Sequence, residues 1–115
     1  MAFNKIEREQ YEKQVGDFVE RRRPPKEIRY QVDLGFRIRG NSVELFEIRP
    51  LWSDPERTIE EPVAKATYSP KTGTWKLYWQ QSDLKWHRYR HAPEAASLDE
   101  FLDIVEKDEH DCFWG

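Results

Sequence analysis

Residues 4–22 place their apolar side chains three or four positions apart, the spacing of a helix with one buried side. The buried stripe is predicted to hold Tyr11, Val15, Phe18 and Val19. Asn4 and, three positions later, Glu7 form a capping-box pattern at the start of this helix. Pro24 and Pro25 end it, because a proline disfavours the helical conformation of the residue before it.

A second helical pattern lies near the C-terminus. Ser97 and Glu100 form another capping-box pattern there. The predicted buried stripe consists of Leu98, Phe101, Leu102 and Val105. The tail that follows, residues 110–115, is apolar for a chain end, and we predict that it docks on the core because frayed tails are usually polar.

Between the helical segments the apolar pattern changes to a period of two. Residues 28–39 alternate without interruption, which predicts one long antiparallel strand with a dry and a wet face. The dry face would consist of Ile28, Tyr30, Val32, Leu34, Phe36 and Ile38. The wet face would carry Arg29, Arg37 and Arg39.

A turn signal at residues 40–41 introduces a second strand, residues 43–48, whose apolar pattern changes phase. The apolar side chains divide between two faces, with Val43 and Leu45 on one and Phe46 and Ile48 on the other. A β-bulge near Leu45 and Phe46 would restore a single apolar face.

Three prolines make residues 50–62 the longest predicted irregular stretch, and this loop carries Trp52. Residues 63–68 and 74–79 are predicted to form the next hairpin, and residues 86–89 a short fifth strand.

These elements predict a single α+β domain over residues 1–115, with an N-terminal helix, an antiparallel meander of four to five strands, and a C-terminal helix on the same sheet face. Five Trp, five Tyr and six Phe argue for a folded core, because disordered chains are poor in aromatic residues. No apolar run approaches the roughly 18 residues of a membrane span, and no signal-peptide segment opens the chain. A single cysteine cannot form an internal disulfide, so a reducing cytoplasm is the expected location.

The net charge of −3 conceals a division of charge along the chain. Residues 63–93 contain six basic residues and one acidic residue, whereas residues 94–115 contain one basic and eight acidic residues. One interpretation is that the two segments attract each other within the fold. The other is that a basic sheet face binds an anion or a nucleic acid.

Several motifs in this chain are unusual. They are residues 21–25, residues 46–50 with the nearby Trp52, residues 75–79, residues 83–89 and residues 112–115. Their combination resembles the small bacterial family numbered three thousand and twenty-four among the domains of unknown function. The resemblance covers nearly the whole chain. It implies a stand-alone, single-domain protein without an assigned activity, and it carries over no catalytic or binding residue.

The histidines and the cysteine are the candidates for a metal site. Zinc takes imidazole, thiolate and carboxylate ligands, and four ligands could come from His87, His91, His110 and Cys112 if the C-terminus folded back on the last hairpin. Their spacing matches no established zinc signature, and a cysteine more often packs as a small hydrophobe. We therefore expect a protein without metal or other cofactor.

An enzymatic activity is the least favoured function. Cys112 is a poor candidate nucleophile, because the neighbouring Asp108, Glu109 and Asp111 would raise the pKa of its thiol. The glycines are single and far apart, so the chain has neither a P-loop nor a Gly-x-Ser-x-Gly motif.

Nucleic-acid binding is the second-ranked function. Cations interleaved with exposed aromatic rings on a sheet can hold phosphates and stack bases. The candidate residues are Arg29, Arg37, Arg39, Lys76, Tyr78 and Arg88. The acidic last helix and a pI near 5.7 argue against this function.

Protein–protein contact or self-association ranks first. Trp, Tyr and Arg are the residues most enriched in binding hot spots. Trp52 in the predicted loop, Trp86 beside Arg88, and Trp114 near the C-terminus are the candidates. A homodimer formed through an uncovered sheet face or an edge strand is the simplest form of this hypothesis.

Overall fold

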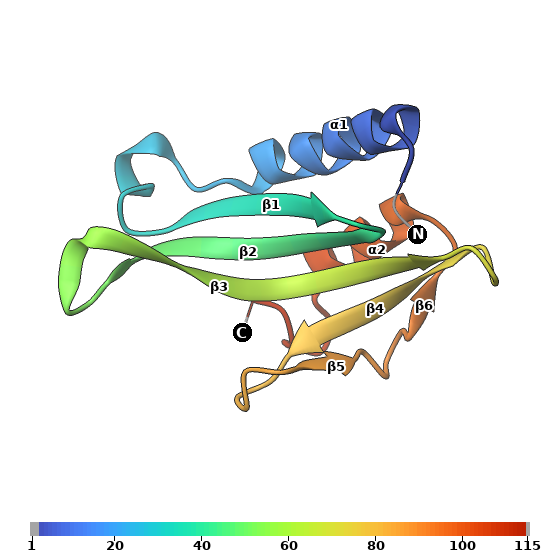
Figure 1. The fold of residues 1–115 in the computed structure, drawn as a ribbon. Coiled ribbons are helices and arrows are strands. Elements are labelled where there is room, and N and C mark those ends of the chain that lie inside the picture. The colour runs from blue at the N-terminus through green and yellow to red at the C-terminus, as the bar shows by residue number, and fades with distance from the viewer. Residues whose placement is uncertain (1–2, 115) are drawn as a thin grey trace.

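Both helices lie on one side of an antiparallel sheet, as Figure 1 shows, so the predicted α+β architecture is confirmed. The protein is described here by a computed structural model that covers residues 3–114. Its elements in chain order are α1 (Lys5–Arg22), a 3-10 turn η1 (Lys26–Ile28), β1 (Asp33–Arg39), β2 (Ser42–Leu51), β3 (Asp54–Ser69), β4 (Thr74–Gln80), β5 (Trp86–Arg88), β6 (Glu94–Ala95) and α2 (Leu98–Lys107). Strands β1 to β5 are neighbours in chain order, and β6 pairs with β4.

The helix α1 forms where its cap and its apolar period predicted it. The backbone N–H of Glu7 donates to the Asn4 side chain over 2.8 Å, and the Glu7 carboxylate accepts from the Asn4 N–H, which completes the capping box. Val15, Phe18 and Val19 are buried against the sheet. None of the described helices is long and apolar enough to cross a membrane.

The helix α2 is also confirmed, and it ends at a residue that anchors the tail. Its four predicted stripe residues are all buried. Asp108 follows the helix in the left-handed conformation (φ 41°), and its carboxylate accepts the backbone N–H groups of Cys112, Phe113 and Trp114. The indole N–H of Trp114 donates to the Val105 carbonyl over 2.8 Å. The predicted docking of the tail is therefore confirmed, apart from Gly115, which lies outside the described residues.

The first strand is shorter than predicted. It begins at Asp33, and residues 28–32 form a turn in which the N–H groups of Gln31 and Val32 both donate to the Ile28 carbonyl. Ile28 and Tyr30 are consequently exposed, by 41% and 72%. The alternation holds within β1 itself, where Leu34 and Ile38 are buried, Phe36 is half-buried and Arg39 is exposed.

The predicted irregular stretch at residues 50–62 is wrong, because these residues extend β2 and β3 into a hairpin. Strand β2 runs to Leu51 and β3 starts at Asp54, with only Trp52 and Ser53 between them. β4 pairs with β3 only from Ala64 onward, so residues 54–63 lie on an open sheet edge. Proline is tolerated on such an edge because no neighbouring strand requires its N–H. This explains why prolines did not prevent a strand. Residues 49–62 are called the hairpin arm, and Figure 1 shows them projecting past the helices.

The predicted bulge is confirmed at Leu45 and Phe46, but the extra residue lies on β3. Leu45 pairs with Ala64 and Phe46 pairs with Pro62, which leaves Val63 unpaired and buried in the core. Strand β2 therefore keeps its alternation. Phe46 stays on the sheet face opposite to Leu45, and the single apolar face expected from the bulge does not form.

Candidate binding face of the sheet

The sheet face turned away from the helices, the outer face, carries one row of polar and aromatic side chains across five strands. Residues that pair across strands lie on the same face. The register places side by side Arg37 of β1, Glu44 of β2, Lys65 of β3, Tyr78 of β4 and Arg88 of β5.

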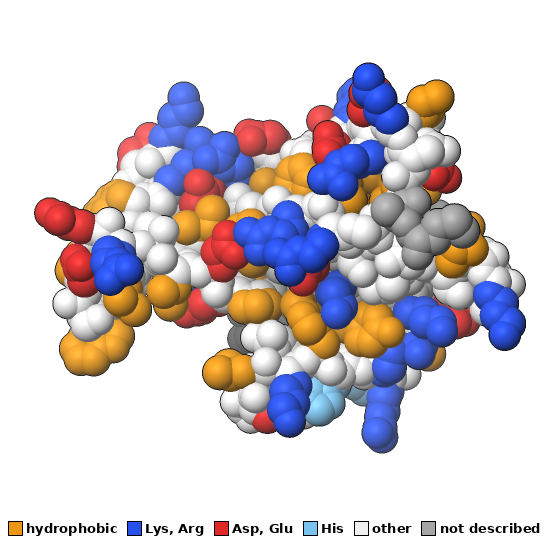
Figure 2. Space-filling model, viewed as in Figure 1, with side chains coloured by type: hydrophobic (Ala, Val, Ile, Leu, Met, Phe, Trp, Pro, Cys, Tyr) orange, Lys and Arg blue, Asp and Glu red, His pale blue; other side chains and the backbone are white. Residues whose placement is uncertain are grey.

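Most of the candidate binding residues from the sequence gather on this outer face. The next row of the register joins Arg39 to Ser42, Thr67 and Lys76, and Trp86 pairs with Gln80 two residues beyond Tyr78. Figure 2 shows Lys and Arg side chains intermixed with hydrophobic ones over this side of the sheet. The outer face thus unites Arg37, Arg39, Lys76, Tyr78, Trp86 and Arg88.

The cations of the outer face lie over its aromatic rings. The Lys65 Nζ is 4.9 Å from the centroid of Tyr78 and 5.0 Å from that of Trp86. The Arg88 guanidinium lies 5.6 Å from the Tyr78 centroid on the same face. We call Arg88, Tyr78, Lys65 and Trp86 the cation–aromatic ladder, since each cation is held by the negative face of a ring.

A second cation–aromatic pair extends the face towards β1. The Arg37 guanidinium lies 4.7 Å from the centroid of Phe46, and its NH2 group donates to both Glu60 oxygens over 2.7 and 2.9 Å. This hydrogen bond raises the pKa of Arg37, so its charge is permanent. A backbone without a side chain at Gly35 leaves room for the Phe46 ring, since a Cβ there would meet the ring at 2.8 Å.

One carboxylate on this face is incompletely bonded. Glu44 stands between Arg37 and Lys65 in the row, and its Oε2 atom is buried without a hydrogen-bond partner among the described residues. The negative charge of this carboxylate attracts the Arg37 and Lys65 cations on either side of it towards the sheet surface. The row therefore has a negative centre with positive groups on either side.

The family model described as Domain of unknown function (DUF3024) matches residues 3–115. The chain belongs to this family. No curated protein and no solved structure matches it. For this DUF3024 protein, the outer face has to be interpreted from its own geometry.

Two of the predicted binding residues of the DUF3024 protein lie away from the outer face. Arg29 lies in the turn before β1, where its Nε donates to the Pro24 carbonyl over 2.9 Å. The expectation that it shares a face with Arg37 and Arg39 is wrong, because the strand does not extend to residue 29. Trp52 lies at the tip of the hairpin arm and is 92% exposed.

Lys65 is the residue of the ladder that the sequence reading missed. It falls in a strand that was predicted correctly, at the position between Ala64 and Ala66, which are both buried. That alternation placed its side chain on the wet face. Its contact with Tyr78 and Trp86 depends on the register with β4 and β5, which the alternation alone does not determine.

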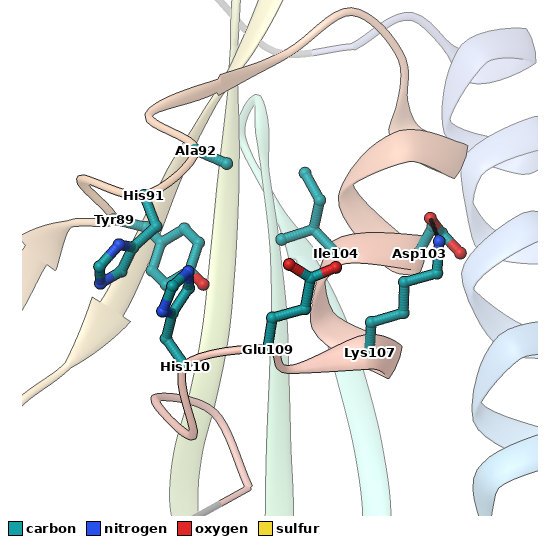
Figure 3. A pocket seen from close by; sticks show the side chains of 8 residues that line it. All are labelled: Tyr89, His91, Ala92, Asp103, Ile104, Lys107, Glu109 and His110. Carbon is teal, nitrogen blue, oxygen red and sulfur yellow. Dashed lines mark ion pairs between the residues drawn. The ribbon is translucent and has the colours of Figure 1, made fainter.

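The predicted histidine and cysteine cluster is only partly assembled in the DUF3024 protein. His91 and His110 stack with ring centroids 3.6 Å apart, as Figure 3 shows, while His87 bonds to Asp83 over 2.8 Å. Stacked imidazoles direct their nitrogens outward in parallel planes and do not converge on one ion. Within residues 3–114 no group of three or more His, Cys, Asp or Glu side chains is placed to hold a metal.

The thiol of Cys112 is in an environment that keeps it protonated. Burial raises its pKa most, and the charges of Asp108 and Asp111 raise it further. The Sγ atom donates weakly to the His110 carbonyl over 3.6 Å. The raised pKa of the Cys112 thiol agrees with the rise expected from the acidic residues that surround it in the sequence.

Proposed function

We propose that this protein is a single-domain, non-enzymatic binding module whose outer face binds an acidic surface of a partner protein. The observation that carries the proposal is the cation–aromatic ladder. Its rings lie within 4.9–5.6 Å of the Lys65 and Arg88 cations, an attraction that favours one position for each of these side chains on the outer face. Charged side chains that are already ordered lose less conformational entropy when a partner binds. Tyr and Arg are also among the residues that dominate binding energy at interfaces.

The same ladder favours a protein over a nucleic acid. Base stacking requires a free ring face, but Lys65 lies over both Tyr78 and Trp86, and Arg37 lies over Phe46. The outer face also contains the carboxylates of Glu44 and Glu60, which would repel phosphates. The phosphates of a nucleic acid repeat at a fixed spacing. The carboxylates of an acidic protein segment need not, so such a segment can place them away from Glu44 and Glu60.

Nucleic-acid binding is the second candidate function, and the cation content of the outer face favours it. Arg37, Arg39, Lys65, Lys76 and Arg88 all lie on this face. Cations that contact phosphates give an affinity that falls steeply with added salt. A reducing cytoplasm, where a protein with a single cysteine would remain reduced, is compatible with both functions.

The experiment is affinity capture from lysate, with and without nuclease, by the protein and by two charge variants. Lys65→Glu combined with Arg88→Glu reverses the ladder. Lys71→Glu reverses an exposed charge in the β3–β4 turn, outside the outer face, and serves as the matched control. We expect a captured protein that survives nuclease, is lost with the ladder variant and is retained with the control.

Two results would contradict the proposal. Capture that disappears with nuclease would favour the nucleic-acid function, and the salt dependence of binding to a fluorescent oligonucleotide would then confirm it. Capture that is equal for the ladder variant and the wild type would show that the outer face is not the binding surface.

A further inference from the structure

The hairpin arm carries an apolar tip that the other described residues leave exposed. Trp52 is 92% exposed, and all residues from Pro55 to Pro62 are exposed along β3. Isolated exposed apolar residues are common, but a tryptophan at the tip of a projecting hairpin is a typical binding anchor. The arm is also acidic, with Asp54, Glu56, Glu60 and Glu61 against the single Arg57 in residues 53–62.

A cleft of about 370 Å³ lies elsewhere on the same chain, between the end of β4, β5 and the C-terminal tail. It is lined by Trp79, Gln81, His87, Arg88, Arg90, His91 and Cys112. The cleft is in the size range of sites that hold a bulky ring. We call it the β5 cleft. It joins an aromatic ring with two arginines, and Arg90 is exposed without an ion-pair partner among the described residues.

The chemistry of the arm tip matches that of the cleft. Trp52 is followed after one residue by Asp54, whose carboxylate has no cationic partner among residues 3–114. An indole ring next to a carboxylate fits a cleft that offers Trp79 beside Arg88 and Arg90. Within one chain the tip is in solvent rather than in the cleft, so the match can be satisfied only between chains.

We propose that the β5 cleft receives the Trp52 tip of a second copy of this chain, with the two copies exchanging arms. Each chain carries one tip and one cleft, so a reciprocal exchange closes a dimer with two-fold symmetry. The contact uses neither Lys65 nor Tyr78, but it shares Arg88 with the cation–aromatic ladder. The tests below therefore substitute Trp52 and Arg90 and leave Arg88 unchanged, so that they separate this contact from the function proposed for the outer face.

Pairing of the open β3 edges is a less suitable way to join two copies. Pro55 and Pro62 stand at the two ends of the exposed edge, and Glu56, Glu60 and Glu61 lie between them. Prolines and charges on an edge strand discourage strand addition. The arm therefore offers its tip more readily than its edge.

The first test is the oligomeric state by analytical ultracentrifugation across micromolar concentrations. We expect a dimer for the wild type, and a dissociation constant about 30-fold higher for Trp52→Ala, the effect of losing a hot-spot tryptophan. Ile6→Ala is the matched control, because Ile6 is also a large exposed apolar residue (69%) but lies on α1. We expect it to leave the dimer unchanged.

The second test uses Cys112, the single cysteine of the chain, which lines the β5 cleft. A Ser53→Cys variant places a thiol beside Trp52, and mild oxidation should then link two chains through Cys112. The cross-link should be seen on a non-reducing gel and should disappear when Cys112→Ser is added. A cross-link that persists without Cys112 would join two arm tips and would overturn the proposal.

The third test mixes two defective variants. Arg90→Glu damages the cleft and Trp52→Ala damages the tip, so each alone should be largely monomeric. A mixture should form heterodimers, because the intact tip of one variant meets the intact cleft of the other. A wild type that stays monomeric, or a mixture that stays monomeric while the wild type dimerises, would overturn arm exchange without affecting the outer-face proposal.

Discussion

Single side chains with several backbone partners determine how the C-terminal part of this chain is held. Asp108 is buried, takes up a left-handed conformation and accepts three consecutive N–H groups of the tail. These donors would be left without partners if the carboxylate were removed, and a buried unpaired N–H group costs more than an average hydrogen bond contributes. The residue thus links the end of α2 to the docked aromatic tail.

Replacing Asp108 tests this link. Asp108→Ala should lower the free energy of unfolding by about 3 kcal/mol, because N–H donors lose a charged acceptor near the core. Asp108→Asn should cost about 1 kcal/mol, since asparagine tolerates the left-handed conformation and keeps one acceptor oxygen. Urea denaturation measures both. Equal losses for the two variants would contradict the role assigned to the carboxylate.

A second residue-scale prediction concerns acid stability. The Arg23 guanidinium, which bonds to Asp33 over 2.8 and 2.9 Å, lowers the pKa of Asp33, and the N–H of Leu34 lowers it further. A carboxyl whose folded pKa is depressed contributes stability above its unfolded pKa of about 3.9, and this contribution is lost as the pH falls through the folded pKa.

The variant Asp33→Asn should therefore unfold at lower urea concentration than the wild type at pH 7. The difference between the two midpoints should shrink as the pH is lowered below about 4. Urea titrations at a series of pH values give both results. A difference that stays constant with pH would show that the ion pair with Arg23 contributes nothing specific.

At the scale of the elements, local signals predicted the helices well and the strands less well. The caps at Asn4 and Ser97 lie within a few residues of the groups they bond, so the sequence reveals them directly. The alternation of residues 28–39 continued past the true start of β1, because a turn held by Ile28 happens to follow the same period. The hairpin arm was missed because prolines permit a strand whose edge has no neighbour.

The binding face shows the same division between local and non-local information. The alternation of apolar and polar residues correctly placed Arg37 and Arg39 on the solvent-facing side of β1. It also correctly placed Lys76 and Tyr78 together on one face of β4. It could not show that Lys65 meets Tyr78 and Trp86, because that contact depends on how three strands pair.

Two glycines offer a matched test of element packing. Gly35→Ala should destabilise the protein by about 1–3 kcal/mol, because the added carbon would meet the Phe46 ring at 2.8 Å and force it away from Arg37. Gly16→Ala should stabilise α1 by about 0.5–1 kcal/mol, since its added carbon would stay 3.8 Å from Phe36 in a helix interior. Thermal unfolding of both variants shows whether each substitution lowers or raises the melting temperature. A neutral Gly35→Ala would mean that Phe46 moves without cost.

At the scale of the whole molecule, charge is divided between two sides. Three of the six cations of residues 63–93, namely Lys65, Lys76 and Arg88, lie on the outer face. The acidic side chains of α2, which are Asp99, Glu100, Asp103 and Glu106, are exposed on the opposite side of the sheet. Among the described residues, no ion pair joins residues 63–93 to residues 94–115. The interpretation that the two segments attract each other is therefore supported by no ion pair, although Lys76 of β4 and Glu94 of β6 are opposite each other in the register.

The exposure of Trp52 has a consequence for spectroscopy. Trp75 is 3% exposed and the arm-tip tryptophan 92%, so a neutral quencher such as acrylamide would reach the second ring far sooner than the first. The chain therefore contains its own fluorescent reporter of the arm. Any assembly that covers the tip would protect part of the emission from the quencher, and it would do so without a label.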